Sequence, residues 1–369
     1  AEPADCLADT RREQNMTLLD RYIARTVLLH TLMVMAVLMA LLSLVTFIGQ
    51  QDDIGQGSYG VADAFLFTLL SLPQQVYELL PIATLIGAIL GLGALARDSE
   101  LTVVRAAGVS IVRIAASAAL AGLAVAALMW LLGEYLAPPA DQYARQHKIF
   151  SKYSQLDMAG SSAWVRQGSW FLNVRQQAAD NHFGGVFVYE LDADRRLRLV
   201  GHAETAAQDA AGRWMLSNYA ETRLDATRVE ARGRDHEEAG TRFNVDFLGL
   251  AVTKPSAQPL MGLYAYIRHL QANNLDARAW EIAFWSRIAR LVAAVMVCIF
   301  AVPFALGPLR SAGAGSRTVL GIMAGVLFVL LTQTLENSGL VYGLNPLLVA
   351  WGPTLLLAVV SFVAIRRAH

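Results

Sequence analysis

The chain has 369 residues, of which 55% are hydrophobic and 16% are charged. Globular domains carry about 25% charged residues, so this composition excludes an ordinary soluble protein and indicates that several segments lie in lipid. The 30 basic and 30 acidic residues give a formal net charge of zero, without the basic excess typical of nucleic-acid binding. Cys6 lies near the N-terminus and Cys298 deep in an apolar run, so they build neither a disulfide framework nor a thiolate metal site.

Residues 1–15 are polar and show no periodicity, whereas Met16 begins a stretch typical of a chain start. We therefore expect residues 1–15 to be an extension outside the fold. The first long apolar run, at about 27–48, is long enough to span a bilayer. It is therefore interpreted as a membrane span and not as the apolar region of a cleaved signal peptide.

Six segments are apolar enough to cross a membrane, which takes about 20 residues in a helix. The second is too long for one straight crossing and contains Pro73 and Pro81, which predicts a tilted or kinked helix. The expected spans are about 27–48, 62–96, 109–137, 282–306, 319–335 and 346–365.

Lysine and arginine in the short connections predict the orientation of these spans, because such residues are retained on the cytoplasmic side. The connections 49–61 and 336–345 contain neither, and their charged residues are acidic. The termini and the other short connections hold Arg11, Arg12, Arg21, Arg25, Arg97, Arg105, Arg113, Arg310, Arg317, Arg366 and Arg367. We expect both termini in the cytoplasm and the long insert at 138–281 outside.

The insert differs in pattern from the rest of the chain. Short segments that alternate polar and apolar residues are separated by Gly, Asp and Asn, which is typical of an antiparallel sheet in a sandwich or jelly roll. The clearest are 163–174, 185–191, 195–200, 213–216 and 242–248, and helical spacing returns at 260–279. The predicted fold is an α-helical membrane protein with six transmembrane helices (3+3) and an inserted antiparallel β domain of jelly-roll type. Its expected divisions are 16–137, 138–275 and 276–369.

The sequence lacks the motifs of common catalytic sites. Its three lysines, Lys148, Lys152 and Lys254, neither follow a glycine-rich run nor precede Ser or Thr, so there is no Walker A loop. His236 has no second histidine four residues on, as a zinc helix would require, and no Gly-x-Ser-x-Gly elbow occurs. The chain is therefore predicted not to be an enzyme and to bind no cofactor itself.

The connection at about 98–108 is the most informative short segment. Asp98 or Ser99 can cap a helix there, and Gly108 can end it. Leu101 and Val104 form a short apolar stripe. A short amphipathic helix on the cytoplasmic face would suit the groove of an ATPase that moves the adjacent spans, and a simple turn is the alternative.

Two ionisable residues, Glu78 and Arg290, lie at membrane depth, where charge is costly and by default marks function. Ordinary explanations are equally open, because Glu78 lies between two prolines and Arg290 can extend to the interface. Gly87-x-x-x-Gly91 places small residues on one helix face, which predicts close helix packing.

Five segments, taken in order, resemble the lipopolysaccharide export permease family. They are Leu19-Asp-Arg-Tyr-Ile-Ala-Arg, Gly55-Gln-Gly-Ser-Tyr, Ser99-Glu-Leu-Thr-Val-Val-Arg-Ala-Ala-Gly, Gly133-Glu-Tyr-Leu-Ala-Pro and Gly307-Pro-Leu-Arg-Ser. The resemblance covers residues 16–367 and is closer to the LptG half of the family than to its LptF paralogue.

The resemblance implies a transport subunit that works with several partners. These would be an LptF-like permease subunit, a dimer of an LptB-like ATPase that carries ATP and Mg²⁺, and LptC-like and LptA-like periplasmic proteins. The subunit would lie in the inner membrane of a Gram-negative bacterium and extract lipopolysaccharide from its outer leaflet, with the β domain in the periplasm. The coupling helix would contact the ATPase through Glu100, Leu101, Val104, Arg105, Ala106 and Gly108.

The resemblance also implies a lipid site with basic groups above an apolar cavity, because lipopolysaccharide carries phosphates and acyl chains. Arg145 and Lys148 match basic positions of the family. Asp52 and Asp53 stand where relatives can carry lysines, so they contact phosphate only if a divalent cation bridges them. The candidate residues are Arg145, Lys148, Arg287, Arg290, Asp52, Asp53, Phe47, Phe67 and Phe328.

Three alternatives remain open at this stage. The first is the paralogous LptF half of the same exporter. The second is a mechanotransmission protein, which uses an ATPase to drive an external domain and needs neither a lipid cavity nor a basic rim. The third is a membrane enzyme with an external active site, against which the lack of a convergent nucleophile, base or metal set argues.

Overall fold

The computed structural model describes residues 3–152, 163–167, 169–179, 182–192, 196–208, 214–224, 228–238, 255, 258–306 and 314–367. The chain divides into two compact units. The helical unit comprises Ala1–Ile48, Ser71–Ala140 and Glu281–His369. The second unit comprises Gly49–Leu70 and Asp141–Trp280, and it contains the β-sheet.

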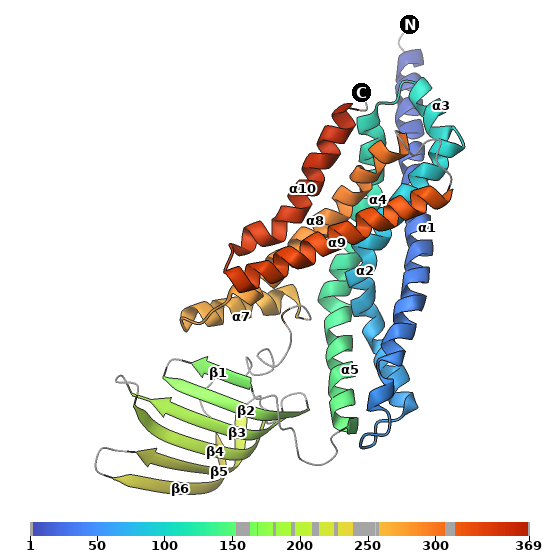
Figure 1. Cartoon of the computed structure of the whole chain (residues 1–369). Helices are drawn as coiled ribbons and strands as arrows, with labels where there is room; N and C mark the ends of the chain where they lie inside the picture. The colour runs from blue at the N-terminus through green and yellow to red at the C-terminus, as the bar shows by residue number, and fades with distance from the viewer. Residues whose placement is uncertain are drawn as a thin grey trace. The chain divides into compact units, whose positions relative to one another are not determined.

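Six helices of the described chain are long and apolar enough to cross a membrane, as the sequence predicts. The helices that contain them are α1 (Pro3–Ile48), α2 (Val61–Arg97), α4 (Ile111–Leu131) with α5 (Ala137–Lys152), α8 (Arg278–Leu306), α9 (Ala314–Tyr342) and α10 (Pro346–Arg367) (Figure 1). Three short elements connect them: the 3-10 turn η1 (Gln51–Asp53), the helix α3 (Glu100–Ala106) and the π-helical segment η2 (Leu132–Leu136).

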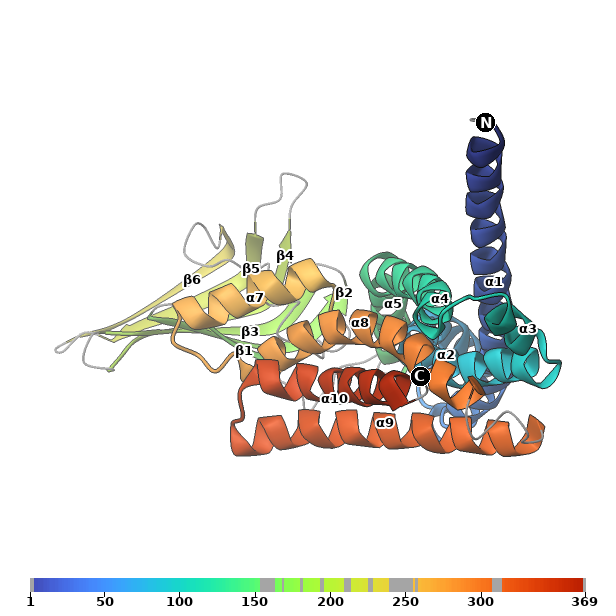
Figure 2. The same ribbon diagram turned by 90° about the horizontal axis from the view of Figure 1, so that it is seen from above.

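The expected helix near 98–108 is confirmed as α3. Within the helical unit, the N-terminal end of α1, the C-terminal end of α10 and α3 lie at the same end (Figure 1). The last two helices, α9 and α10, run side by side (Figure 2). This arrangement brings the residues near both chain termini to the end of the unit that carries α3.

Two helices extend beyond the expected spans. Helix α1 begins at Pro3, so residues 3–15 continue the first span as helix, and their place outside the fold stays a prediction. A proline in the first turn followed by good helix formers favours this continuation. The third span continues through η2 and α5 to Lys152, whereas the sequence suggested that helix ends near residue 137.

Helix α2 forms the centre of the helical unit, and α1 and α9 are its least buried spans. Small residues let the helices approach one another closely. A Cβ atom on Gly87 would lie 2.5 Å from the Cα of Thr31 on α1, and one on Gly91 would lie 3.2 Å from the carbonyl oxygen of Thr26. The predicted packing role of this glycine pair is therefore confirmed, between α1 and α2.

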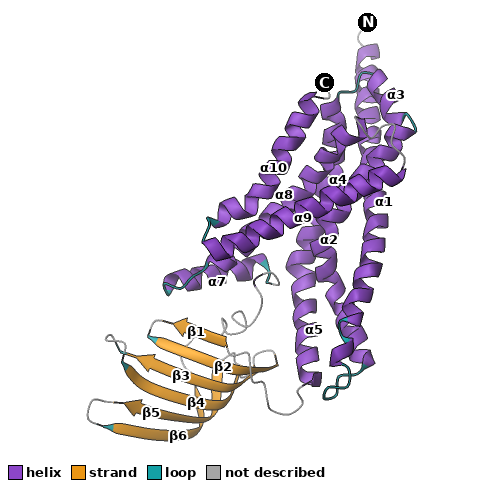
Figure 3. Ribbon diagram, viewed as in Figure 1, coloured by secondary structure: helices purple, strands orange, loops and turns teal. Residues whose placement is uncertain are grey.

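The second unit contains one antiparallel sheet whose six strands pair in sequence order (Figure 3). Its core lies on one face and includes Leu172, Val186, Leu199 and Leu216, as expected from the alternating pattern. The strands are β1 (Ala163–Gln167), β2 (Trp170–Ala179), β3 (His182–Leu191), β4 (Leu197–Gln208), β5 (Trp214–Leu224) and β6 (Val229–Glu238). The inserted antiparallel domain is confirmed, and its jelly-roll form stays a prediction because these strands form a single meander.

Helical spacing predicted at 260–279 corresponds to α7 (Leu260–Ala272), which buries Leu263, Tyr266 and Leu270. Two sequence predictions fall outside the described residues: the strand at 242–248 and the segment 307–311.

Candidate functional site

Helix α3 is held by sharp backbone turns at both ends. Ser99 precedes it in the left-handed conformation, at φ 64°, and its side chain makes no capping hydrogen bond. The predicted cap is therefore wrong, and Asp98 pairs with Arg97 at 2.9 Å instead. The predicted stop is confirmed, because Gly108 has φ 89° and its N–H donates to the carbonyl of Arg105. A left-handed non-glycine residue costs about 1–2 kcal/mol, so the surrounding packing must maintain this turn.

The apolar stripe of α3 faces its own helical unit. Leu101 is 2% exposed, and Val104 packs against the same core cluster, which also includes Ile23 of α1 and Ile114 of α4. The expectation that Leu101 and Val104 pack against an ATPase is therefore wrong: they anchor α3. The residues exposed on this helix are Glu100, Thr102, Val103, Arg105 and Ala106.

Val103 is an exposed apolar residue of α3 that the sequence reading missed. It lies three residues from Glu100 and from Ala106, and side chains three apart share a helix face. The same spacing that identified Leu101 and Val104 as one stripe could thus have identified Glu100, Val103 and Ala106 as the opposite one. This stripe combines an acidic and two apolar side chains, which suits docking to a protein groove.

Residues 20 and 22 of α1 contact α3 and the first turns of α4. The hydroxyl of Tyr22 donates to the Glu100 carboxylate at 2.8 Å. Asp20 pairs with Arg113 at 2.5 Å and accepts a hydrogen bond from the hydroxyl of Ser117, both on α4. Asp20 and Tyr22 were not among the predicted site residues, although the segment that starts at Leu19 contains both. Their contacts give α1, α3 and α4 a common polar joint.

A second group of charged residues gathers in the second unit, where α5 lies beside η1 and the start of α2. We call the set Asp53, Asp63, Asp141, Arg145, His147 and Lys148 the α5 cluster. The Lys148 ammonium pairs with Asp53 at 2.5 Å, donates to Gln50 Oε1 at 2.7 Å and lies 4.9 Å from the ring centre of Phe67. The predicted candidates Lys148, Asp53 and Phe67 are therefore brought together.

The other two pairs of the α5 cluster also join a basic side chain to a carboxylate. Arg145 donates to both carboxylate oxygens of Asp141, at 2.7 and 3.1 Å, through Nε and Nη2. Asp141 is buried and the Arg145 side chain is 51% exposed, so a buried carboxylate orients a guanidinium that remains accessible. His147 Nε2 lies 2.7 Å from Asp63 Oδ1. Asp63 also accepts from the N–H of Gly60, which links the cluster to the first turn of α2.

Tyr59 is buried close to the carboxylates of Asp53 and Asp63. It is almost completely buried, and its hydroxyl donates to Gln50 Oε1 at 3.3 Å. Burial, together with the carboxylates of Asp53 and Asp63, raises the pKa of Tyr59 to about 12. The phenol therefore stays protonated and remains a donor.

The divalent-cation bridge considered for Asp52 and Asp53 stays a prediction, although the described residues offer no complete metal site of protein ligands. They contain no group of three or more His, Cys, Asp or Glu side chains arranged to hold a metal ion. Asp52 is exposed on η1, and Gln56 donates to its backbone carbonyl, not to its carboxylate.

The two predicted arginines of α8 have partners within the helical unit. Buried Arg287 donates from Nη1 to the carbonyl of Gly133 at 2.8 Å, and its guanidinium carbon lies 5.4 Å from the ring centre of Tyr77. Arg290 pairs with Glu336 of α9 at 3.2 Å. Arg287 and Arg290 thus join α8 to η2 and to α9, and their contact with lipid phosphate stays a prediction.

Gly133 lies in the π-helical segment, where the wider turn disturbs the regular pairing of backbone carbonyls. This explains why Arg287 can bind one of them. A Cβ atom at residue 133 would lie 2.8 Å from Cε2 of Tyr77, so the contact requires glycine. Sequence patterns do not predict π-helical segments, and the joint could not have been identified from Gly133 alone.

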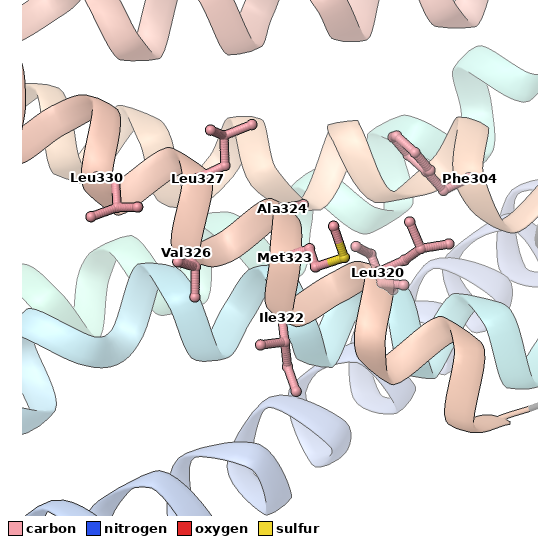
Figure 4. A pocket seen from close by; sticks show the side chains of 9 residues that line it. Phe304, Leu320, Ile322, Met323, Ala324, Val326, Leu327 and Leu330 are labelled. Carbon is pink, nitrogen blue, oxygen red and sulfur yellow. The ribbon is translucent and has the colours of Figure 1, made fainter.

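An apolar cavity of about 550 Å³ lies along the first half of α9, lined by Ile89, Phe304, Leu320, Ile322, Met323, Ala324, Val326, Leu327 and Leu330 (Figure 4). Its volume is in the range of small-ligand sites. None of the three predicted phenylalanines lines it. Phe328 packs against the core cluster, Phe47 is half-buried on α1, and Phe67 lies beside Lys148 of the α5 cluster.

Comparison with known proteins gives a consistent result. Residues 21–367 match the family described as "Lipopolysaccharide export system permease LptF/LptG". The chain is 32% identical over 359 residues to the lipopolysaccharide export system permease protein LptG of Escherichia coli K12, which covers 96% of this chain and 99% of that protein. It is 29% identical over 352 residues to LptG of Haemophilus influenzae, covering 95% and 98% of the two chains.

Proposed function

The chain belongs to the family of lipopolysaccharide export system permeases LptF/LptG, and we propose that it is the LptG-type half of an ATP-driven exporter. In this proposal it extracts lipopolysaccharide from the outer leaflet of the inner membrane and passes it to a periplasmic bridge. Family membership and six apolar helices support a multi-pass inner-membrane protein. ATP and Mg²⁺ would bind a partner ATPase, and not this permease subunit.

The main support for the proposal is that α3 is anchored on one side and exposed on the other. Leu101 fixes the helix to its own unit, whereas Glu100, Val103 and Ala106 lie on its exposed side. The contacts of Tyr22 with Glu100 and of Asp20 with Arg113 join the same region to α1 and α4. A force applied to α3 by an ATPase would thus reach three spans. This is the behaviour required of a coupling helix.

The proposed partners are an LptF-like permease subunit, a dimer of an LptB-like ATPase, and LptC-like and LptA-like periplasmic proteins. The apolar surfaces that α1 and α9 leave exposed can contact lipid or a second permease subunit. Both termini and α3 would be cytoplasmic, which agrees with the arginines near all three. The sheet would then lie in the periplasm and join the bridge through an open edge.

The proposed lipid headgroup site is the α5 cluster. Of its basic side chains, Arg145 is the more exposed, and buried Asp141 orients its guanidinium. Arginine suits phosphate because its planar group can donate two parallel hydrogen bonds. We therefore propose Arg145 as the first phosphate contact, with Lys148 in a secondary role.

The test is reconstitution of the complete complex with its second permease subunit and the ATPase. Bound lipid is identified by mass spectrometry, and ATP-driven release to an LptA-like acceptor is measured. We expect bound lipopolysaccharide that leaves only when ATP is hydrolysed, and no release with an ATPase unable to hydrolyse ATP. Val103→Glu should abolish ATPase binding, whereas Val103→Ala, which adds no charge at the same position, should weaken it less.

A stable ATPase complex without bound lipid or release would contradict the exporter proposal and favour mechanotransmission. The carboxylate partners already present at Arg145 and Lys148 are the observation that keeps this second candidate open, since a mechanotransmission protein needs no basic rim. Retained ATPase binding in Val103→Glu would contradict the assigned docking face of α3.

A further inference from the structure

Lys148 is enclosed by its partners to a degree that Arg145 is not. The side chain of Lys148 is 23% exposed, against 51% for Arg145. An ammonium group has three N–H donors, and two of the groups around it, Asp53 and Gln50, accept from it. The ring of Phe67 lies close to the same charge. Asp53 holds the position nearest the Lys148 ammonium, so an anion that takes this position must replace Asp53.

Arg145 differs because its partner occupies one side of the guanidinium. Asp141 accepts from Nε and Nη2, which accounts for two of the five N–H donors. The remaining donors belong to a side chain that is half-exposed. Arg145 can therefore keep its carboxylate partner and still bind a phosphate, whereas at Lys148 a phosphate in the nearest position would have to displace Asp53.

The surroundings of Lys148 favour retention of Asp53. Burial and, after it, the carboxylates of Asp53 and Asp63 raise the pKa of Tyr59, which places both carboxylates near its hydroxyl. Gln50 accepts from both Tyr59 and Lys148, so the pair belongs to a network rather than to an isolated surface contact. Hydrogen bonds of this kind to charged groups are stronger than neutral ones.

We propose that Asp53 is a specificity-determining residue of the lipid site: its carboxylate occupies the position beside Lys148 that a second phosphate would take. The cluster then engages one phosphate through Arg145 and gains little from another. This inference rests on the proposed function and extends it to substrate class. The site takes a lipid whose headgroup presents a single phosphate to it, and a second phosphate adds no affinity.

The experiment measures binding of two synthetic lipid A probes, with one and with two phosphates, to the complete complex in phosphatidylcholine nanodiscs. The unchanged protein should bind both with similar affinity. Asp53→Asn, which is nearly isosteric, should create a preference of about tenfold for the bisphosphorylated probe, because one additional charge-assisted contact becomes possible. Adding Lys148→Met to Asp53→Asn should cancel that preference.

Asp52→Asn is the matched control, since it removes an exposed charge one residue away and should leave the ratio of affinities unchanged. Asp53→Ser provides a second neutral variant if Asp53→Asn fails to assemble. An unchanged ratio in the Asp53 variants, with both probes still bound, would overturn the inference. Unaltered binding in Arg145→Gln would instead reject the α5 cluster as the lipid site, and failure of every probe to bind would reject the proposed function.

Discussion

Helix α3 follows the C-terminal end of α2, and the α5 cluster lies near the N-terminal end of α2. Different interactions hold the two in place. Helix α3 is fixed by the buried side chain of Leu101, and its charged residues are exposed. The α5 cluster is held by ion pairs such as that of Asp53 with Lys148. A buried apolar side chain finds no equivalent contact in water, whereas a charged side chain can exchange one counter-ion for another. The comparison supports the proposals that α3 transmits movement and that Arg145 of the α5 cluster binds an anion while Asp53 keeps its place beside Lys148.

The largest expected effect comes from removing the apolar anchor of α3. Leu101→Ala should lower the free energy of unfolding by about 2–5 kcal/mol, because it deletes a fully buried side chain. It should also reduce stimulation of the ATPase by the complex. Denaturant titration in mixed micelles and ATPase assays measure the two quantities.

Val103→Ala is the matched control for Leu101→Ala. Val103 is 67% exposed on the same helix, so its truncation should change stability by less than about 0.5 kcal/mol. Equal destabilisation by the two variants would show that α3 is not anchored through Leu101, and the contrast with the α5 cluster would fail.

The next largest effect concerns the joint between α8 and η2. Gly133→Ala should destabilise the protein by about 1–3 kcal/mol, since the added Cβ would meet the ring of Tyr77 at 2.8 Å. A smaller residue at Tyr77 should recover part of this loss. Thermal unfolding in detergent measures the change.

Gly352→Ala on α10 tests the reason for the Gly133→Ala effect. Its added Cβ would meet only Leu335, at 3.6 Å, so it should be neutral or slightly stabilising because alanine favours helix. Similar losses in both variants would mean that general helix packing, and not the contact with Tyr77, makes glycine necessary at residue 133.

The sequence predicted much of the fold because hydrophobic length and strand alternation are local signals. All six spans and the meander strands near 163–174 and 185–191 were identified from them. The extension of α5 to Lys152 was missed because its polar residues do not resemble a membrane span. This helical structure determines the site, since it places Arg145, His147 and Lys148 within a single turn of one helix.

The candidate site was predicted less completely because residue type does not reveal pairing. Arg145 and Arg290 look alike in the sequence, yet Arg145 is half-exposed and Arg290 pairs with Glu336, 46 residues away. Contacts across such separations depend on the packing of whole helices. The same holds for Tyr22 and Glu100, whose side chains meet only after α1 and α3 have packed.

A smaller effect is expected from the polar joint at the start of α1. Tyr22→Phe removes the hydrogen bond to Glu100 and should leave stability nearly unchanged, because both side chains are exposed. It should nevertheless reduce ATPase-coupled lipid release, since Glu100 loses the group that orients it. Thr26→Ala, which removes a hydroxyl bonded only to the Tyr22 carbonyl, is the control. Normal release in Tyr22→Phe would exclude a positioning role for Tyr22.

The smallest effect is confined to alkaline pH and concerns Tyr59. Its pKa of about 12 lies above the ordinary value of 10.0, so folding favours the protonated phenol. This contribution to stability is complete below pH 10 and is lost as the pH rises toward 12, because the unfolded chain releases the proton first. At neutral pH no effect is expected.

Asp53→Asn should lower the pKa of Tyr59, because the carboxylate of Asp53 is one of the groups that raise it. The shift is measured by tyrosinate absorbance, taken as the difference between chains with and without Tyr59→Phe. Asp52→Asn should leave the titration of Tyr59 in place. If Asp53→Asn also leaves it in place, Asp53 does not lie beside Tyr59 and Lys148 in solution. The α5 cluster would then lack the internal counter-ion that distinguishes it from α3.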